Sequence, residues 1–372
     1  MASRAPVPLP PRKDKPKNAP AEGRKRRALR VIDNLVKDPA VEGKPQTNIS
    51  RPVTRSYCKQ LLANVEADEK KGKAFTSTLT ARSKVACEVA NKPKDPIVNI
   101  DAEDANDELA VMEYVDDIYK FYKQTEAENQ ILDYMGKQTD MKGKMRSILV
   151  DWLIAVHNRR QLTPEILYLT INILDRYLSM NLVSRQELQL VGIASMLIAC
   201  KYEQHWAPEV KDFVYWSKKA YTREQILVME KSILGKLEWC LTVPTPYVFL
   251  VRYIKASVTP DKEMENMVFY LAELGLVNHN IILYNPSMIA ASAVYAARCT
   301  LSKKPSWSET LKHYTGYSEN HLKVCAKLLA RLHSTAAEDK LKAVYRKFSN
   351  PDRGTVALLP PEKSLLAAAS SS

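Results

Sequence analysis

The fold is decided by a strongly apolar stretch at residues 145–156, which reads MRSILVDWLIAV. Its apolar residues recur at helical spacing and cover most sides of the predicted helix, so we expect this helix to lie at the centre of a helical bundle. Arg146 and Asp151 interrupt the apolar run, and Asp175 interrupts the next one. Because a buried charge is costly unless it is paired, Arg146 and Asp175 are predicted to form a buried ion pair that holds two helices in register.

Further helices follow along the chain, and capping patterns mark where they begin. Thr163-Pro164, Ser184-x-x-Glu187 and Thr222-x-x-Gln225 each precede a periodic apolar segment. The prolines of segment 243–246 then interrupt the helical pattern. Ser318-x-x-His321 lies 96 residues after the Thr222 pattern and again opens an apolar helix. This repeat predicts two helical bundles of similar plan in tandem.

The positive charge of the chain is concentrated in its first 100 residues. The whole chain has a formal net charge of +13. Residues 1–100 contain 22 Lys and Arg against 10 Asp and Glu, which is +12, and the remaining residues contribute +1. The same segment holds 11 of the 21 prolines and only two aromatic residues. Such a composition cannot bury enough apolar surface to offset the entropy of ordering, so we predict a disordered basic tail.

The motifs of common enzyme and metal sites are absent from the sequence. It has only 10 glycines, without a phosphate-binding loop, and no G-x-S-x-G or H-E-x-x-H pattern. The six cysteines and six histidines show neither paired nor metal-ligand spacing, so zinc sites and disulfide frameworks are not expected. No uncharged apolar run approaches membrane-spanning length. We therefore expect a soluble intracellular protein that acts by binding, without a cofactor or a metal.

The opening stretch and three later segments resemble the cyclin box of mitotic B-type cyclins, in particular those of plants. The later segments are LYLTINILDRYLS (167–179), TPYVFLVRYIKA (245–256) and ASAVYAAR (291–298). The resemblance implies an all-α fold, in which two tandem five-helix cyclin-box bundles follow the disordered basic N-terminal tail.

The predicted domain boundaries follow from this resemblance and from the break at residues 243–246. An apolar helical stripe precedes the first bundle, and it suggests a helix that packs on a bundle or on a partner. Its members are Leu109, Met112, Val115, Ile118, Tyr119 and Tyr122. The five expected parts are a regulatory tail (1–100), an N-terminal helix and linker (101–141), a first cyclin box (142–243), a second cyclin box (244–357) and a flexible C-terminus (358–372).

The resemblance implies a regulatory subunit and not an enzyme. Cyclins bind a cyclin-dependent Ser/Thr kinase through the first bundle and press its regulatory helix into the active arrangement, and B-type members drive the G2/M transition and mitosis. Lys201 and Glu230 match the two charged cyclin positions that contact the kinase, and Tyr202 and Glu203 adjoin the same edge. Neither membrane binding nor direct binding of nucleic acid is expected.

In the same family a shallow apolar groove docks substrates with an Arg-x-Leu motif. Core packing alone would also explain the residues at the matching positions. These residues are Met145, Ile148, Leu149, Trp152, Leu188 and Gln189.

Three departures from the family bear on docking and on kinase contact. Ala155 replaces the usual acidic residue, Arg160 brings a charge where an aromatic residue packs, and Gln204-His205 follows Glu203 where the family has Glu-Ile.

The tail contains two overlapping signals. The basic cluster at residues 24–27 fits a nuclear-import signal, so we expect the protein in the nucleus and the cytoplasm. Arg26, Leu29 and Asn34 match the destruction box of mitotic cyclins. This match implies ubiquitin-dependent degradation through the anaphase-promoting ubiquitin ligase, whereas a merely basic tail is the simpler alternative.

Two other functions remain open at the level of sequence. A diverged cyclin that binds a kinase but activates it poorly is consistent with the three departures. The same double five-helix fold also serves as a nucleic-acid-binding transcription module. The near-neutral charge of the helical part, +1 over residues 101–372, argues against that module.

Overall fold

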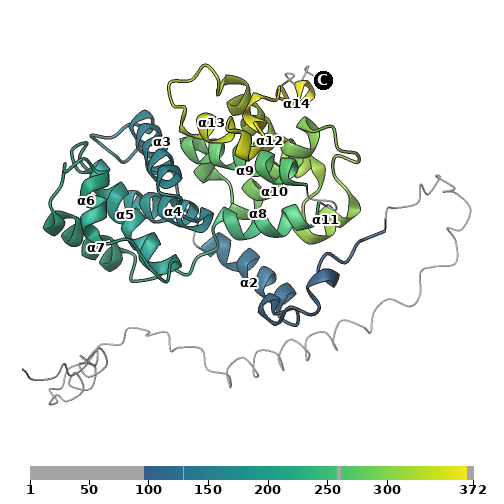
Figure 1. Ribbon diagram of the computed structural model, residues 1–372, viewed down its shortest axis with the longest axis horizontal. Helices are drawn as coiled ribbons and strands as arrows, with labels where there is room; N and C mark the ends of the chain where they lie inside the picture. The colour runs from purple at the N-terminus through teal and green to yellow at the C-terminus, as the bar shows by residue number, and fades with distance from the viewer. Residues whose placement is uncertain (1–95, 129, 258–260, 367–372) are drawn as a thin grey trace, which may run out of the picture. The chain divides into compact units, whose positions relative to one another are not determined.

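The computed structural model describes residues 96–128, 130–257 and 261–366, and every secondary-structure element in these ranges is helical (Figure 1). This confirms the all-α prediction for the described part of the chain. The destruction-box residues Arg26, Leu29 and Asn34 lie outside the described residues.

The first bundle contains five helices, as predicted, and α5 is its central helix. The residues of α5 from Leu190 to Cys200 are all buried, and the helix packs against α4 and α7. A Cβ atom at Gly192 would lie 2.9 Å from Cδ1 of Leu149 on α3, so the glycine allows α3 and α5 to approach closely. The helices are α3 (Gly143–Arg159), α4 (Pro164–Met180), α5 (Leu188–Glu203), α6 (Val210–Trp216) and α7 (Arg223–Lys236).

The second bundle repeats this plan with five more helices. Its central helix is α10, which packs against α8, α9 and α12. The alanine-rich part of α10 is buried without a gap from Ile289 to Arg298, and it corresponds to the small-residue part of α5. The helices are α8 (Pro246–Lys255), α9 (Lys262–Val277), α10 (Pro286–Thr300), α11 (Glu309–Thr315) and α12 (Glu319–Thr335).

Most of the predicted capping patterns coincide with helix starts. α4 begins at Pro164 and α12 begins directly after Ser318. The Thr222-x-x-Gln225 pattern forms a reciprocal cap, because each side chain accepts the backbone N–H of the other residue. The Ser184-x-x-Glu187 pattern instead closes a turn, and α5 begins only after Glu187.

Helix α3 does not occupy the centre of the first bundle, so the expectation from its apolar pattern was wrong. It lies between the two bundles, with α5 on one side and α9 and α13 (Ala343–Phe348) on the other. Two residues face the second bundle with hydrogen bonds: Ser147 Oγ donates to Val277 O at 2.8 Å, and Asp151 Oδ1 accepts from the Ala343 N–H at 2.8 Å. Its wide apolar surface is therefore covered by two different bundles.

The predicted buried pair between Arg146 and Asp175 is confirmed. Arg146 Nε and Nη2 donate to the two carboxylate oxygens of Asp175 at 2.7 and 2.6 Å. Tyr134 Oη donates to the same carboxylate at 2.7 Å, and Arg146 Nη1 donates to Leu276 O at 3.0 Å. The pair therefore joins α3 to α4 and also reaches α9 of the second bundle.

The segment before the first bundle packs on the second bundle. Residues 96–100 were predicted as part of the disordered tail, but Ile100 is buried and the Val98 N–H donates to Thr310 Oγ1 at 3.2 Å. The boundary at residue 100 was therefore placed too late, because apolar and hydrogen-bonding contacts begin earlier. In α2 (Val115–Glu128), Tyr119 and Tyr122 pack near Phe249. The predicted stripe is only partly covered.

The C-terminal boundary at residue 357 was also wrong. The short helix α14 (Lys363–Leu366) packs against α12, and Leu365 is buried. Burial of the apolar Leu365 side chain stabilises the contact of this end of the chain with the second bundle. Residues 367–372 lie outside the described part of the chain.

Candidate functional site

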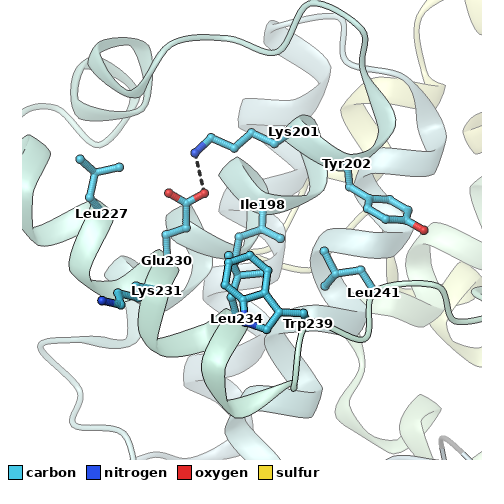
Figure 2. A pocket seen from close by; sticks show the side chains of 9 residues that line it. All are labelled: Ile198, Lys201, Tyr202, Leu227, Glu230, Lys231, Leu234, Trp239 and Leu241. Atoms are coloured by element: carbon cyan, nitrogen blue, oxygen red, sulfur yellow. Dashed lines mark hydrogen bonds and ion pairs between the residues drawn. The ribbon is translucent and has the colours of Figure 1, made fainter. Parts of the chain in front are cut away.

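A shallow pocket of about 450 Å³ lies between α5 and α7, and we call it the α5–α7 pocket (Figure 2). Helix α5 contributes residues at positions i, i+3 and i+4, and helix α7 contributes a similar row, so each helix presents one face. The segment after α7 closes one side. The lining residues are Ile198, Lys201, Tyr202, Leu227, Glu230, Lys231, Leu234, Trp239 and Leu241.

Lys201 and Glu230 were predicted as the two charged kinase-contact residues, and both line this pocket, where they form an ion pair. Lys201 Nζ donates to Glu230 Oε1 at 2.6 Å, as the dashed line in Figure 2 marks. The lysine side chain is 46% exposed, whereas the glutamate side chain is 11% exposed. The lysine retains two N–H donors for other acceptors, because an ammonium group carries three. The lysine end of this pair is half-exposed and remains available to a partner, whereas the glutamate carboxylate is largely buried.

Tyr202 and Glu203 differ in their position. The ring of Tyr202 lines the pocket and is 47% exposed, and its hydroxyl group lies 2.7 Å from Thr242 Oγ1. Glu203 does not line the pocket. Partial burial and the nearby Glu165 carboxylate raise the pKa of Glu203 above its ordinary value. We therefore place Tyr202 in the site and Glu203 beside it.

Sequence reasoning missed the apolar part of this pocket. Trp239 is 69% exposed although its ring is large and apolar, and it lies three residues after Lys236, the last residue of α7. Leu227 and Leu234 stand seven residues apart on α7, next to the stripe of Ile226 and Ile233 that fills the core. The sequence contains a signal for this surface, because Leu227 and Leu234 form a second apolar row beside Ile226 and Ile233. Two adjacent apolar rows indicate that a helix packs against neighbours on two faces.

The residues of the predicted docking groove separate into two groups. Leu149 and Leu188 are buried at 5% and 6% exposure, so they are core residues. Ile148 is 49% exposed. Met145, Trp152 and Gln189 are half-buried. The structure therefore leaves surface for docking at four of the six predicted positions.

The structure accommodates the departures from the family pattern. The Arg160 guanidinium lies over the rings of Tyr215 and Trp216, at 5.6 and 5.1 Å from their centres, so α6 holds the charge by cation–π contacts. Ala155 is exposed on α3, and the exposed His205 ring packs edge-on against Trp206. The helices that carry the α5–α7 pocket are continuous, α5 from Leu188 to Glu203 and α7 from Arg223 to Lys236.

Two kinds of site are absent from the described residues. No group of three or more His, Cys, Asp and Glu side chains in residues 96–366, outside the gaps, is placed to hold a metal ion. No helix in the same ranges combines the length and apolar character needed to cross a bilayer.

Comparison with known proteins decides the family. The cyclin N-terminal domain model matches residues 117–242, and the cyclin C-terminal domain model matches residues 244–362. The chain belongs to the cyclin family. The junction between the two matches falls at the break between α7 and α8, where the sequence pattern also divides.

The relatives of this cyclin are G2/mitotic B-type cyclins of plants. It is 52% identical to Cyclin-B1-4 of Arabidopsis thaliana, over 93% of this chain and 92% of the relative. It is 48% identical to the G2/mitotic-specific cyclin S13-6 of Glycine max, over 97% of this chain and 95% of the relative. Membership in this group gives the cyclin a regulatory role in the cell cycle.

A solved structure supports the fold independently. The viral cyclin from herpesvirus saimiri is similar over 57% of this chain and 96% of its own, with a TM-score of 0.52 and 22% identity. At this identity the likeness concerns the fold alone.

Proposed function

We propose that this cyclin binds and activates a cyclin-dependent Ser/Thr kinase through the α5–α7 pocket, as a non-catalytic regulatory subunit of the G2/M transition and mitosis. The observation that carries the proposal is the combination of an apolar pocket with a charged pair at its edge, on the first bundle of a cyclin. Family membership supplies the kinase as the class of partner.

The pocket suits the regulatory helix of a kinase. Its apolar floor, formed by Ile198, Leu234 and Leu241, would accept an aliphatic side chain. Lys201 would donate to backbone carbonyl groups of the kinase, and Glu230 would accept from its N–H groups. These contacts are made only when the kinase helix is in its active position, so they shift the kinase population toward the active state.

Trp239 and Tyr202 are the expected anchors of this contact. Trp and Tyr are enriched among the few residues that dominate binding energy, because they bury large rigid surfaces. Both line the pocket, at 69% and 47% exposure, so both have surface to lose on binding.

Histone phosphorylation by a purified mitotic cyclin-dependent kinase tests the proposal, with and without the full chain. We expect strong stimulation by the wild type. Lys201→Ala, Glu230→Ala and Trp239→Ala should each raise the concentration for half-maximal stimulation about thirtyfold or more, because hot-spot truncations cost about 2 kcal/mol or more.

Matched variants separate binding from folding in this assay. Val228 is 70% exposed on α7 but does not line the pocket, and Lys219 is exposed before α7. Val228→Ala and Lys219→Ala should stimulate like the wild type, and far-UV circular dichroism should be the same for all variants. Equal stimulation by the pocket variants would refute the site, and association without stimulation would instead favour a diverged cyclin.

We propose a separate role for the exposed part of the predicted docking groove. Ile148 and Trp152 would contact the leucine of an Arg-x-Leu substrate, although Ala155 offers no carboxylate to its arginine. Ile148→Ala with Trp152→Ala should reduce phosphorylation of a substrate that carries Arg-x-Leu. Phosphorylation of the same substrate with Ala-x-Ala should not change. Equal loss on both substrates would exclude docking as the cause.

We also propose that Arg26, Leu29 and Asn34 form a destruction box read by the anaphase-promoting ubiquitin ligase, in a protein that is present in nucleus and cytoplasm. A cation and an apolar anchor in a short linear motif support this reading. Arg26→Ala with Leu29→Ala should lengthen the lifetime of the protein at mitotic exit, measured after synthesis is blocked. Unchanged turnover would refute the motif.

A further inference from the structure

A second pocket, of about 320 Å³, lies on the second bundle among α2, α8 and α11, and we call it the Arg252 pocket. It does not share a residue with the α5–α7 pocket. Its volume is at the lower end of the range in which small ligand groups bind. Aromatic rings form much of its wall, from Tyr119, Phe249, Tyr253 and Tyr314.

The guanidinium of Arg252 lies between two of these rings. It is 5.0 Å from the ring centre of Tyr119 and 5.1 Å from that of Tyr314. The residue is only 5% exposed, and Nη1 donates to the buried carboxylate of Asp101. A guanidinium has five N–H donors in a planar fork, so a single firm carboxylate contact leaves part of the fork unused.

The second carboxylate at this guanidinium is weakly held. Asp116 Oδ1 lies 3.4 Å from Arg252 Nη2, which is long for a charge-assisted hydrogen bond. The Asp116 side chain is 90% exposed, so water competes for it. An incoming oxyanion could replace it at little cost, because exposed ion pairs are worth little.

Positive groups predominate at the pocket. Lys120, Lys123 and Arg252 line it with one carboxylate, Asp116, and the buried Asp101 carboxylate balances Arg252, which leaves an excess of one positive charge. Lys123 is held in place, since Nζ donates to Thr315 O at 3.1 Å. Lys120 is exposed and makes no hydrogen bond or ion pair with the described residues.

We propose that the Arg252 pocket binds an oxyanion group, phosphate or carboxylate, carried on a peptide side chain. The oxyanion accepts from Arg252 Nη2 and Lys120 Nζ, and Asp116 moves into solvent. Arg favours such groups because its parallel N–H donors match two oxygens. The aromatic walls exclude water around the contact and strengthen it. The site is independent of the kinase proposed as partner.

Isothermal titration calorimetry with the full chain tests this site. The probes are three short glycine-flanked peptides that carry phosphothreonine, glutamate or threonine at the centre. We expect the phosphothreonine peptide to bind about tenfold more tightly than the threonine peptide. Equal binding of the glutamate peptide would assign the site to carboxylates, and weaker binding would assign it to phosphate. Equal binding of all three would overturn the proposal.

Two variants with opposite expected effects on peptide affinity distinguish binding at this pocket from binding to the basic tail. Asp116→Asn removes the competing carboxylate, so it should tighten binding about threefold, and Lys120→Ala should weaken it about fivefold. Lys262→Ala changes an exposed lysine elsewhere on the second bundle and should have no effect. Because all three side chains are exposed, folding should not change. Weaker binding by Asp116→Asn, or equal binding by Lys120→Ala and Lys262→Ala, would overturn the proposal.

Discussion

Arg146 shows at the scale of one residue how this fold depends on exact charge pairing. Its side chain has no exposed surface, two hydrogen bonds join it to Asp175, and Tyr134 Oη and Leu276 O each add one more hydrogen bond to the pair. Removing one partner leaves the other charge buried without compensation, which is far more costly than losing a surface pair.

Asp175→Asn should therefore lower the free energy of unfolding by about 3–5 kcal/mol, because Arg146 keeps its charge in a dry site. Urea denaturation of the full chain, followed by circular dichroism, measures this loss. Lys323→Ala, which breaks an exposed pair with Glu319, serves as the control and should change stability by less than about 1 kcal/mol. A similar small loss for both variants would contradict the role of the buried pair.

His157 adds a pH dependence to stability. It is 3% exposed and donates from Nε2 to Thr163 O at 2.8 Å. Burial, together with the nearby charges of Lys347 and Arg353, lowers its pKa to about 4. The folded state therefore takes up this proton only near pH 4, whereas the unfolded chain takes it up near pH 6.5, so stability falls as the pH falls between these values.

This difference corresponds to about 3 kcal/mol at pH 4. His157→Gln should flatten the decrease in melting temperature between pH 6.5 and pH 4.5. His313→Gln, at an exposed position, should keep the wild-type slope. If His157→Gln also kept that slope, the buried neutral histidine would not be its source.

At the scale of elements, α13 depends on a residue from the other bundle. Asp151 on α3 accepts the N–H of Ala343, the first residue of α13, and so acts as a cap from outside the helix. Burial raises the pKa of Asp151 above its ordinary value, although the Ala343 bond opposes this. The folded state therefore disfavours the ionised form of Asp151, and the contribution of this residue to folding stability becomes less favourable as the pH rises.

Asp151→Ala should destabilise the protein by about 1 kcal/mol, as the loss of a cap does. Asp151→Asn keeps an acceptor for the Ala343 N–H and loses the buried charge, so at pH 7 it should be at least as stable as the wild type. Chemical denaturation at pH 7 compares the three proteins. A less stable Asn variant than Ala variant would show that the charge itself is needed.

The elements were predictable from the sequence where the signal was local. Capping patterns at Thr163, Thr222 and Ser318 marked helix starts correctly, because cap residues act within one turn. The position of α3 was not predictable in this way. Its apolar width reports that two faces are covered, but periodicity cannot distinguish one surrounding bundle from two neighbouring ones.

At the scale of the whole described structure, both bundles pack against α3, so they are not independent domains joined by a flexible linker. Arg146, Ser147 and Asp151 all bond to backbone groups of the second bundle from the same helix. We therefore predict that both bundles unfold in one transition. In calorimetry the measured enthalpy should equal the van't Hoff enthalpy. Two resolved transitions, or a ratio well above one, would contradict this view.

The candidate site was only partly predictable, for a related reason. Lys201 and Glu230 were identified by resemblance to the family, but their pairing is a contact between two helices, made by residues 29 positions apart in the sequence. Trp239 gives no periodic signal because it follows the end of α7, and only its exposure in the folded chain marks it. The apolar half of the site therefore emerged from the structure.

Hydrogen–deuterium exchange of the full chain, alone and with a purified mitotic cyclin-dependent kinase, tests the central claim most directly. The account predicts slower exchange in α5, in α7 and in the segment around Trp239 when the kinase is present. Exchange in α12 should not change. Slowing confined to the second bundle, or no slowing at all, would contradict the claim that the α5–α7 pocket binds the kinase.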